Sequence, residues 1–584
     1  MKNPTQPISL QISVLIGLGF MANVAWAETP VSIPGAGLLG QTLPSSTLVI
    51  PSSPKETHLT LPEEQSKNTD TGNQKASIII RKVIINGLQS EREISLPRLQ
   101  KTVAGFLNKP QTFSGLQAMT DALTQDARAQ GLLLAQAVLP PQRISNGILT
   151  VNILPGTFDS SQINNASRLS TKRVQNIVSR VFPAGSVVQR KKIERVALLL
   201  AEIPGVRPSL SLRPGVNTGS SAMDITIMPG KRMGGYLGLD NAGISSTGRS
   251  RAVAGFYVNE LLGQGDQLKV DLLSAYENNG LLTGSVDYSQ LAGSFGTRVG
   301  GNYSRLGYHY SLQGLKFNGY SNNFKLYLTQ PWVRTFATQV DFSADVGMQM
   351  LNDQYPSQLS VFTNGDTGRK AVTQGSVGVQ GRSVWSSGGM TRFSVQGTVG
   401  RLELKNTAAR FWSSSDLLNS SGEFSRLNYQ LTHEQPVAGP LSLFGSVTGQ
   451  QASKNLDSSQ KFLMGGPAMV RAYDTGIGGV DDGAVASIEL RSQWALPALW
   501  RAGEGHHLTI ASFYDQGWGS QYHHNNGLTN QNSINMAGAG LYGQLTRNSD
   551  YALTLTWAHR TAASNQTQEK NSRNQFWLTA VKAF

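Results

Sequence analysis

The sequence predicts a mainly β protein, in which two small α+β modules precede an antiparallel transmembrane β-barrel of about 16 strands. Three observations lead to this fold class. From about residue 231 to the end, apolar and polar side chains alternate with a period of two. Between residues 78 and 229, short strand-like runs are mixed with helical periodicity. After the N-terminus no apolar run of about 18 residues occurs, so any membrane insertion has to use strands.

The composition excludes several classes of protein. The 584 residues contain no cysteine, so neither a disulfide framework nor a thiolate metal site is available. The net charge of +14 is scattered along the chain and forms no basic stripe, so nucleic acid is not expected as a partner. The mean hydropathy of −0.22 is compatible with a membrane barrel, because alternation hides the apolar face in the average.

The N-terminus has the pattern of a secretory signal peptide over residues 1–27. Lys2 supplies the positive start, residues 12–22 are mostly apolar, and Ala25 and Ala27 are the small residues that precede cleavage. The mature chain is therefore expected to begin at Glu28, outside the cytoplasm.

Residues 28–77 are rich in Pro, Ser and Thr and are expected to form no packed core. The one helical candidate is residues 35–43, whose two internal glycines make its helix propensity marginal.

The first module is predicted over residues 78–156 in the order β-α-α-β-β. Strands are expected at 78–85, 132–139 and 148–154, and helices at 96–107 and 113–130. The second module is predicted over residues 157–229, with helices at 171–182 and 190–201 and strands at 209–213 and 223–227.

The barrel is predicted over residues 230–584. In residues 339–350 every even position is apolar and every odd position is polar or Gly. One such strand also fits a soluble sheet, but many of them without helices require a closed barrel, whose apolar face meets lipid and whose backbone is fully paired. At about 22 residues per strand the region supplies about 16 strands. The terminal run 576–584 ends in Phe584 and reads as the closing strand.

Two motifs then resemble a known family. Residues 462–473 contain Val470, Arg471, Ala472 and Tyr473 and are similar to the conserved inward-folded loop of the TpsB transporters of two-partner secretion, in the Omp85 superfamily. The family usually has Gly where this chain has Ala472, so a left-handed backbone at that position is not expected here.

The second motif is Phe513, Asp515 and Gly517, which resembles the family's barrel-wall Phe-x-Asp-x-Gly. The resemblance implies that a loop near residues 455–482 folds into the lumen and that Arg471 forms a salt bridge with Asp515. A guanidinium can hold a carboxylate through two parallel hydrogen bonds, which fixes the orientation of the loop as well as its charge.

The resemblance covers nearly the whole mature chain and implies its organisation. Residues 28–48 would contain a plug helix, 49–77 a linker, and the two modules would be POTRA (polypeptide transport-associated) domains. The protein would lie in the outer membrane of a Gram-negative bacterium, with residues 28–229 mainly periplasmic.

The implied function is export of a large secreted exoprotein that carries an N-terminal secretion domain. The POTRA domains would capture the unfolded exoprotein and the barrel would pass it to the cell surface. A haemolysin, an adhesin and a contact-dependent growth-inhibition toxin all remain open as cargo. The other expected partners are outer-membrane lipid and the barrel-assembly machinery, and the chain is expected to be monomeric.

Three other functions fit the sequence less well. An Omp85-type assembly and insertion factor is the alternative, and the presence of only two modules with a plug-and-linker segment argues against it. A passive porin would leave nearly 150 residues of modules without a purpose. An enzyme is not expected, because no Gly-x-Ser-x-Gly elbow is present. The histidine pairs 506–507 and 523–524 have turn-like neighbours without nearby carboxylates, so neither a metal nor a cofactor is predicted.

Overall fold

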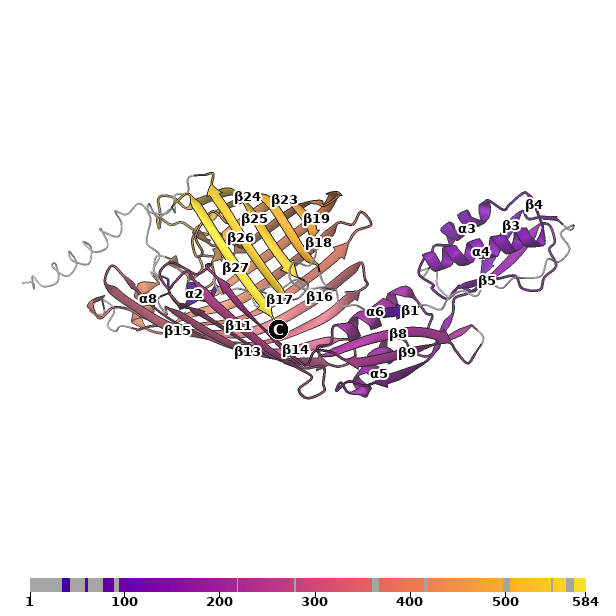
Figure 1. Ribbon diagram of the computed structural model, residues 1–584, viewed down its shortest axis with the longest axis horizontal. Helices are drawn as coiled ribbons and strands as arrows, with labels where there is room; N and C mark the ends of the chain where they lie inside the picture. The colour runs from indigo at the N-terminus through magenta and orange to yellow at the C-terminus, as the bar shows by residue number, and fades with distance from the viewer. Residues whose placement is uncertain are drawn as a thin grey trace, which may run out of the picture.

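The computed structural model describes residues 34–41, 58–60, 77–88, 94–217, 219–277, 280–359, 367–413, 418–496, 505–547, 550–562 and 572–584. It consists of a large closed barrel with two small modules in series at one end, here called the module end (Figure 1). Strands β10–β20 and β23–β27 form the barrel, 16 in all. The predicted fold class is confirmed.

Every pair of neighbouring barrel strands is antiparallel, and β10 pairs with β27 to close the barrel. The strands are β10 (Met233–Asp240), β11 (Arg251–Asn259), β12 (Gln267–Ala275), β13 (Leu281–Ala292), β14 (Thr297–Leu312), β15 (Leu315–Arg334), β16 (Thr338–Gln354), β17 (Thr367–Val384), β18 (Met390–Leu404), β19 (Gly422–Ala438), β20 (Leu441–Ala452), β23 (Asp482–Leu496), β24 (His506–Ser520), β25 (Ser533–Arg547), β26 (Tyr551–Arg560) and β27 (Asn574–Ala583). Short helices η1 (Ser357–Leu359) and α8 (Thr407–Trp412) lie in two of the connections.

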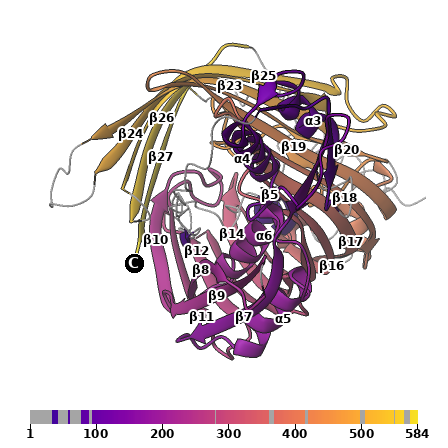
Figure 2. The ribbon, with the colours of Figure 1, turned by 90° about the vertical axis from the view of Figure 1, so that its right-hand side faces the viewer.

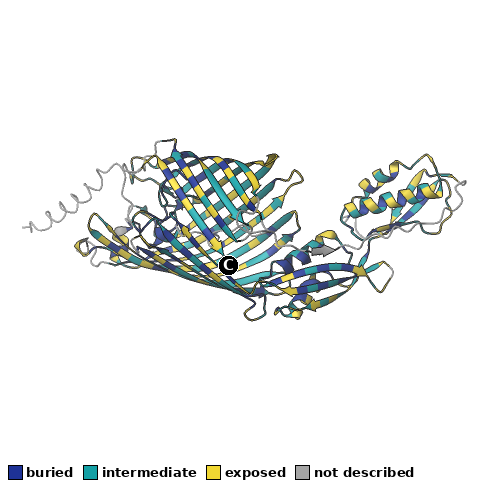
Figure 3. Cartoon of the chain, in the orientation of Figure 1, coloured by how far each residue is buried: buried dark blue, intermediate teal, exposed yellow. Residues whose placement is uncertain are grey.

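Alternation along the strands separates two faces of the barrel. Leu326, Val346 and Val377 are more than half exposed on the outer face, whereas Asp345 lines a cavity with polar side chains of the inner wall. Exposed residues alternate with buried and intermediate ones along the strands (Figure 3). An apolar outer face with fully paired strands is the arrangement that a bilayer stabilises. Among the described residues, no helix has the length and apolar character needed to cross a bilayer.

The first module packs two helices on a three-stranded sheet. Its elements are β2 (Ile78–Ile79), β3 (Lys82–Asn86), α3 (Leu96–Ala104), β4 (Pro110–Gln111), α4 (Phe113–Ala129), β5 (Gln136–Val138) and β6 (Ile148–Leu154). The sheet order is β3-β6-β5, with β3 and β6 parallel. Leu116, Met119 and Leu123 recur at helical spacing on α4 and are buried against Val151 and Ile153 of the sheet. The predicted first strand is divided, because Ile80 interrupts the ladder between β2 and β3 and is itself fully buried.

The second module has the same plan and contains two strands that the sequence analysis did not predict. It comprises β7 (Thr157–Asn165), α5 (Thr171–Val181), α6 (Arg190–Ala201), β8 (Val206–Pro214) and β9 (Ser220–Pro229). The sheet order is β1-β8-β9-β7, and its edge strand β1 (His58–Thr60) comes from the region predicted as a linker. That short strand pairs in parallel with β8, from His58↔Ser209 to Thr60↔Ser211.

The second module is fastened to the module end of the barrel by its two helices (Figure 2). On α5, the Arg173 guanidinium donates to Gln264 Oε1 at 2.7 and 2.9 Å and to the Leu291 carbonyl at 3.0 Å. Glu202, which caps the C-terminus of α6, forms an ion pair of 2.8 Å with Arg334, whose side chain is only 6% exposed. These contacts join the β11–β12 connection and the ends of β13 and β15 to one module.

A buried carboxyl lies at this junction. Glu260 follows β11, has a positive φ of 52° and is 3% exposed. Burial raises the pKa of the Glu260 carboxyl to about 7, and the neighbouring Asp266 adds to the effect.

Candidate functional site: the loop inside the barrel

The connection between β20 and β23 folds into the barrel and builds a small core there. This lumen loop (residues 455–482) contains the two-residue strands β21 (Phe462–Leu463) and β22 (Gly479–Val480), which pair with each other. Its apolar side chains pack with those of the inner wall in one buried cluster made of Phe462, Met464, Val470, Ala472, Tyr473, Val480, Val485, Phe513, Ile534, Met536 and Ala558. The loop is therefore a packed element of the barrel interior.

Arg471 and Asp515 meet at the tip of the lumen loop. Arg471 donates from Nε to Asp515 Oδ2 at 2.9 Å and from Nη2 to Asp515 Oδ1 at 2.6 Å, which is the two-pronged geometry of a guanidinium–carboxylate pair. The backbone N–H of Arg471 also donates to Asp515 Oδ2, at 3.0 Å. Asp515 is fully buried and the Arg471 side chain is 11% exposed, so the pair is largely removed from water.

A second carboxylate, which the sequence analysis did not identify, also holds Arg471. Glu489 on β23 lies 2.8 Å from Arg471 Nη1, and its side chain is 5% exposed. Glu489 in turn contacts Arg491 at 2.8 Å and accepts a hydrogen bond from Tyr542. The guanidinium carbon of Arg471 lies 3.4 Å from the centre of the Phe513 ring, which gives the motif phenylalanine a cation–π contact.

Two glycines on the wall allow the loop to lie this close. A Cβ added at Gly517 would lie 2.9 Å from Val470 Cγ2, so the last motif position has no room for a side chain. A Cβ added at Gly538 on β25 would lie 2.3 Å from the Ala472 Cβ. Ala472 is not among the described residues with positive φ, and its methyl group occupies space that Gly538 leaves free.

Val470 and Tyr473 complete the tip and are both fully buried. The Tyr473 hydroxyl donates to the Ala562 carbonyl at 3.1 Å and accepts from the Ala537 N–H at 3.4 Å. The four loop residues and three wall residues singled out from the sequence thus all lie at one contact. Ala25 and Ala27 lie outside the described residues.

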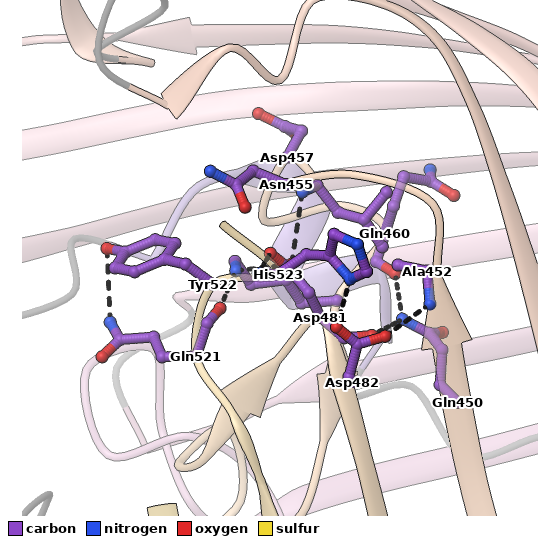
Figure 4. Close-up of polar contacts among 12 residues, drawn as sticks. Gln450, Ala452, Asn455, Asp457, Gln460, Asp481, Asp482, Gln521, Tyr522 and His523 are labelled. Carbon is purple, nitrogen blue, oxygen red and sulfur yellow. Dashed lines mark hydrogen bonds and ion pairs between the residues drawn. The ribbon is translucent and has the colours of Figure 1, made fainter. Parts of the chain in front are cut away.

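The base of the loop has a separate polar anchor (Figure 4). Asp481 is fully buried and accepts hydrogen bonds from Lys461 Nζ at 2.7 Å, from the Leu456 N–H at 3.2 Å and from the His523 N–H at 3.0 Å. These contacts tie both ends of the loop to the connection between β24 and β25.

The histidine pairs differ from the sequence-based expectation. His523 Nδ1 lies 2.6 Å from Asp482 Oδ2, so the expectation that it has no carboxylate neighbour is wrong. His506 begins β24 and is 3% exposed, packed beside the ring of Tyr551. Neighbouring strands bring these groups together across gaps in the sequence. Within the described part of the chain, no group of three or more His, Asp or Glu side chains is arranged to hold a metal.

A short helix also lies inside the barrel and touches the loop. Helix α2 (Ala36–Gln41) falls within the segment proposed as a plug, and Leu38 and Leu39 are buried against wall residues of β11–β16. The Ala36 N–H donates to Asp353 Oδ1 at 2.8 Å. A Cβ added at Gly37 would lie 2.4 Å from Ser459 Cβ, so the glycine that weakens helix propensity permits direct contact between α2 and the lumen loop.

The site consists of two segments that are held inside the barrel. A loop and a helix are both fastened to the inner wall by directional polar contacts, and the modules stand at one open end.

Comparison with known families gives two matches. Residues 219–543 match the family described as haemolysin secretion/activation protein ShlB/FhaC/HecB. Residues 78–156 match the POTRA domain, ShlB-type.

Individual proteins agree with these matches. The heme/hemopexin transporter protein HuxB of Haemophilus influenzae (strain 86-028NP) is 29% identical over 502 residues, which cover 85% of this chain and 86% of that protein. The outer membrane transporter CdiB of Dickeya dadantii is 24% identical over 408 residues, 68% of this chain and 70% of that protein. The solved structure of CdiB from Escherichia coli has the same fold, with a TM-score of 0.66, 17% identity and full coverage of both chains.

Proposed function

The chain belongs to the ShlB/FhaC/HecB family of haemolysin secretion/activation proteins, and from this premise we propose how its parts divide the work of export. It is an outer-membrane transporter that takes an exoprotein from the periplasm and exports it through the barrel by two-partner secretion. The first module (78–156) is a POTRA domain, and we assign residues 157–229 to a second one. Residues 28–48 would supply the plug and residues 49–77 the linker.

We propose that the lumen loop and α2 keep the resting barrel closed and that the Arg471–Asp515 contact is the main fastening of the loop. The observation that supports this most is the buried two-pronged contact between a loop residue and a wall residue 44 positions apart. Such a contact holds the loop in one orientation, because the planar guanidinium and the carboxylate form two parallel hydrogen bonds. Both hydrogen bonds would break together when the loop leaves the wall. Glu489 belongs to the same fastening, since it pairs with the remaining guanidinium nitrogen.

The modules are suited to capture an extended chain. The sheet of the first module ends in the short strand β5, and an open strand edge can accept an extended peptide by strand addition. In the second module, the edge beside β8 already carries β1. Capture of the secretion domain is therefore assigned first to residues 78–156, followed by transfer past the fixed second module into the barrel.

The cargo is a large exoprotein, and the relatives favour one class of it. HuxB is named a heme/hemopexin transporter, and it matches this chain with higher identity and over a longer stretch than CdiB does. We propose a cargo connected with heme or hemopexin, ahead of the haemolysin, adhesin and growth-inhibition toxin alternatives. Loss of this chain should then abolish growth on hemopexin-bound heme as the only iron source, and unchanged growth would contradict this assignment.

The remaining assignments are proposals that the fold and the family support. The family consists of secretion transporters, and we propose that this chain catalyses no reaction and needs no cofactor. Its other partners would be outer-membrane lipid, against the apolar face, and the barrel-assembly machinery that inserts it. We propose that it works as a monomer, because the barrel closes on itself with one chain.

Deletion of residues 157–229 tests the division of labour. Export should be abolished, because the first module would no longer be held at the entrance, while the barrel should still insert and shift on gels when heated. A barrel with residues 78–156 deleted is the matched control for loss of capture alone. Undiminished secretion by either inserted variant would contradict the assigned roles.

A further inference from the structure

The barrel closes where β10 pairs with β27, here called the seam, and this pair of strands has the shortest ladder of the barrel. Strands β10 and β27 are paired over five residues, from Tyr236↔Ala583 to Asp240↔Thr579, whereas every other neighbouring pair of described barrel strands is matched over eight or more. Strand β27 continues beyond Thr579 to Asn574, but β10 ends at Asp240. Part of β27 therefore has no β10 ladder beside it.

The tip of the lumen loop lies where this ladder ends. The Trp577 indole N–H donates to the Arg471 carbonyl at 2.7 Å, and Gln575 Nε2 donates to Asp474 Oδ1 at 2.7 Å. Both side chains belong to the part of β27 that β10 does not reach. The loop thus contacts one side of the seam through two buried hydrogen bonds.

Asp474 also contacts the other side of the seam. Arg249, in the connection between β10 and β11, donates from Nη2 to both carboxylate oxygens of Asp474 at 2.9 Å. The Asp474 side chain is 11% exposed and that of Arg249 is 40% exposed. One carboxylate therefore links the first hairpin of the barrel to its last strand.

We propose that Asp474 braces the seam, so that seating of the lumen loop and closure of the β10–β27 seam are one transition. When the loop leaves its seat, Asp474 releases Arg249 and Gln575 together. Among the described residues, the seam beyond the ladder is then held by Asn241, whose side chain bonds to the Phe576 carbonyl at 2.9 Å and to the Leu578 N–H at 2.8 Å, and whose backbone N–H donates to the Leu578 carbonyl at 3.3 Å. Asp474 is a positioning residue for the transport cycle. This inference rests on the proposed function only in requiring that the loop move.

A distance measurement across the seam tests the brace in the absence of cargo. Because the full-length chain lacks cysteine, spin labels can be attached to cysteines at Ser245 and Asn574, both exposed and on opposite sides of the seam. The purified wild-type barrel should give one narrow distance distribution. Asp474→Ala should add a second population at a longer distance. Asp474→Asn can still bond Gln575 but loses the charge that holds Arg249, so its long-distance population should be smaller than that of Asp474→Ala.

Asp287→Ala is the matched control, because Asp287 lies on the inner wall at β13 and accepts a hydrogen bond from the Tyr327 hydroxyl, away from the loop and the seam. It should leave the distribution unchanged. The proposal is overturned if Asp474→Ala, in a barrel shown to be folded by its heat-dependent gel shift, keeps the wild-type distribution, or if Asp287→Ala widens the seam equally. Failure of export in cells would contradict the proposed function and would leave these distances unaffected.

Discussion

Replacing Arg471 should release the lumen loop more strongly than replacing either of its carboxylate partners. Arg471→Ala leaves two buried carboxylates, Asp515 and Glu489, without their shared cation. Breaking a buried ion pair by removing one partner costs about 3–5 kcal/mol. At about 1.4 kcal/mol per factor of ten, the seated form should lose about 10²- to 10⁴-fold in population relative to the released form.

Replacing Asp515 should destabilise the seated loop more than replacing Glu489 does. After Asp515→Ala, Arg471 still contacts Glu489 and Ser487. The seated loop should therefore lose about 1.5–3 kcal/mol relative to the released loop, which is the contribution of a hydrogen bond to a charged group. After Glu489→Gln, Arg471 keeps both prongs on Asp515, and the cost should be about 1 kcal/mol or less. Arg471→Lys should behave more like alanine than like wild type, because an ammonium cannot reproduce the planar fork.

The assay is the ratio of open to closed time of single barrels in planar bilayers. Arg382→Ala is the matched control, because Arg382 is an exposed arginine on β17 bonded to the Gln339 side chain and does not contact the loop. Its open probability should equal that of wild type. The double variant of Arg471 and Asp515 should cost less than the sum of the two single variants. The reasoning would be refuted if Arg471→Lys kept the open probability of wild type. It would also be refuted if Glu489→Gln raised the open probability as much as Arg471→Ala does.

Three further outcomes are expected. Gly538→Ala should raise the open probability because its methyl group collides with Ala472, and adding Ala472→Gly should restore closure; no rescue would mean that this contact does not seat the loop. Glu260 has a folded-state pKa of about 7 against an ordinary 4.5, so its contribution to stability is present below about pH 4.5 and is lost as the pH rises to about 7. Glu260→Gln should therefore flatten the dependence of the thermal unfolding midpoint on pH over that window, and an unchanged slope would contradict this prediction. Proteolysis of inside-out outer-membrane vesicles should digest residues 28–229 and spare the barrel, and protection of that segment would contradict the topology.

Much of the architecture could be predicted from local pattern alone. The apolar side chains of the barrel strands all face the bilayer, and those of α4 all face the core of the first module. Both patterns are therefore visible without knowledge of the neighbouring elements. Strand β7 was missed because residues 159–162 are all polar, and its place depends on pairing with β9. Strand β1 was missed for a similar reason, since it is a three-residue strand defined only by the edge of β8.

The site was predictable only in part. The pairing of Arg471 with Asp515 came from a family resemblance, because no local pattern relates residues 44 positions apart. Glu489 carried a usable signal: Ser487, Glu489 and Arg491 alternate with Ile488 and Leu490, which indicates that Glu489 faces the lumen. Its distance from Arg471 depends on the seating of the loop.

The role of Gly538 depends on strand register. Gly538 pairs with Asp515 across β24 and β25, and that register brings it against Ala472. A one-residue shift of β25 would present a neighbouring side chain to the loop instead. The compensation between Ala472 and Gly538 therefore becomes visible only in three dimensions.

The most direct test of export through the barrel interior compares two neighbouring residues of β18. Gln396 faces the lumen, where its side chain bonds to Asp345, and Val395 is 44% exposed on the outer face. A photo-crosslinking amino acid is placed at each position in cells exporting an exoprotein that is stalled by a folded fusion. Crosslinks to the exoprotein should form from position 396 and be absent from position 395. Crosslinks from position 395, or none from position 396 while export proceeds, would contradict passage through the lumen.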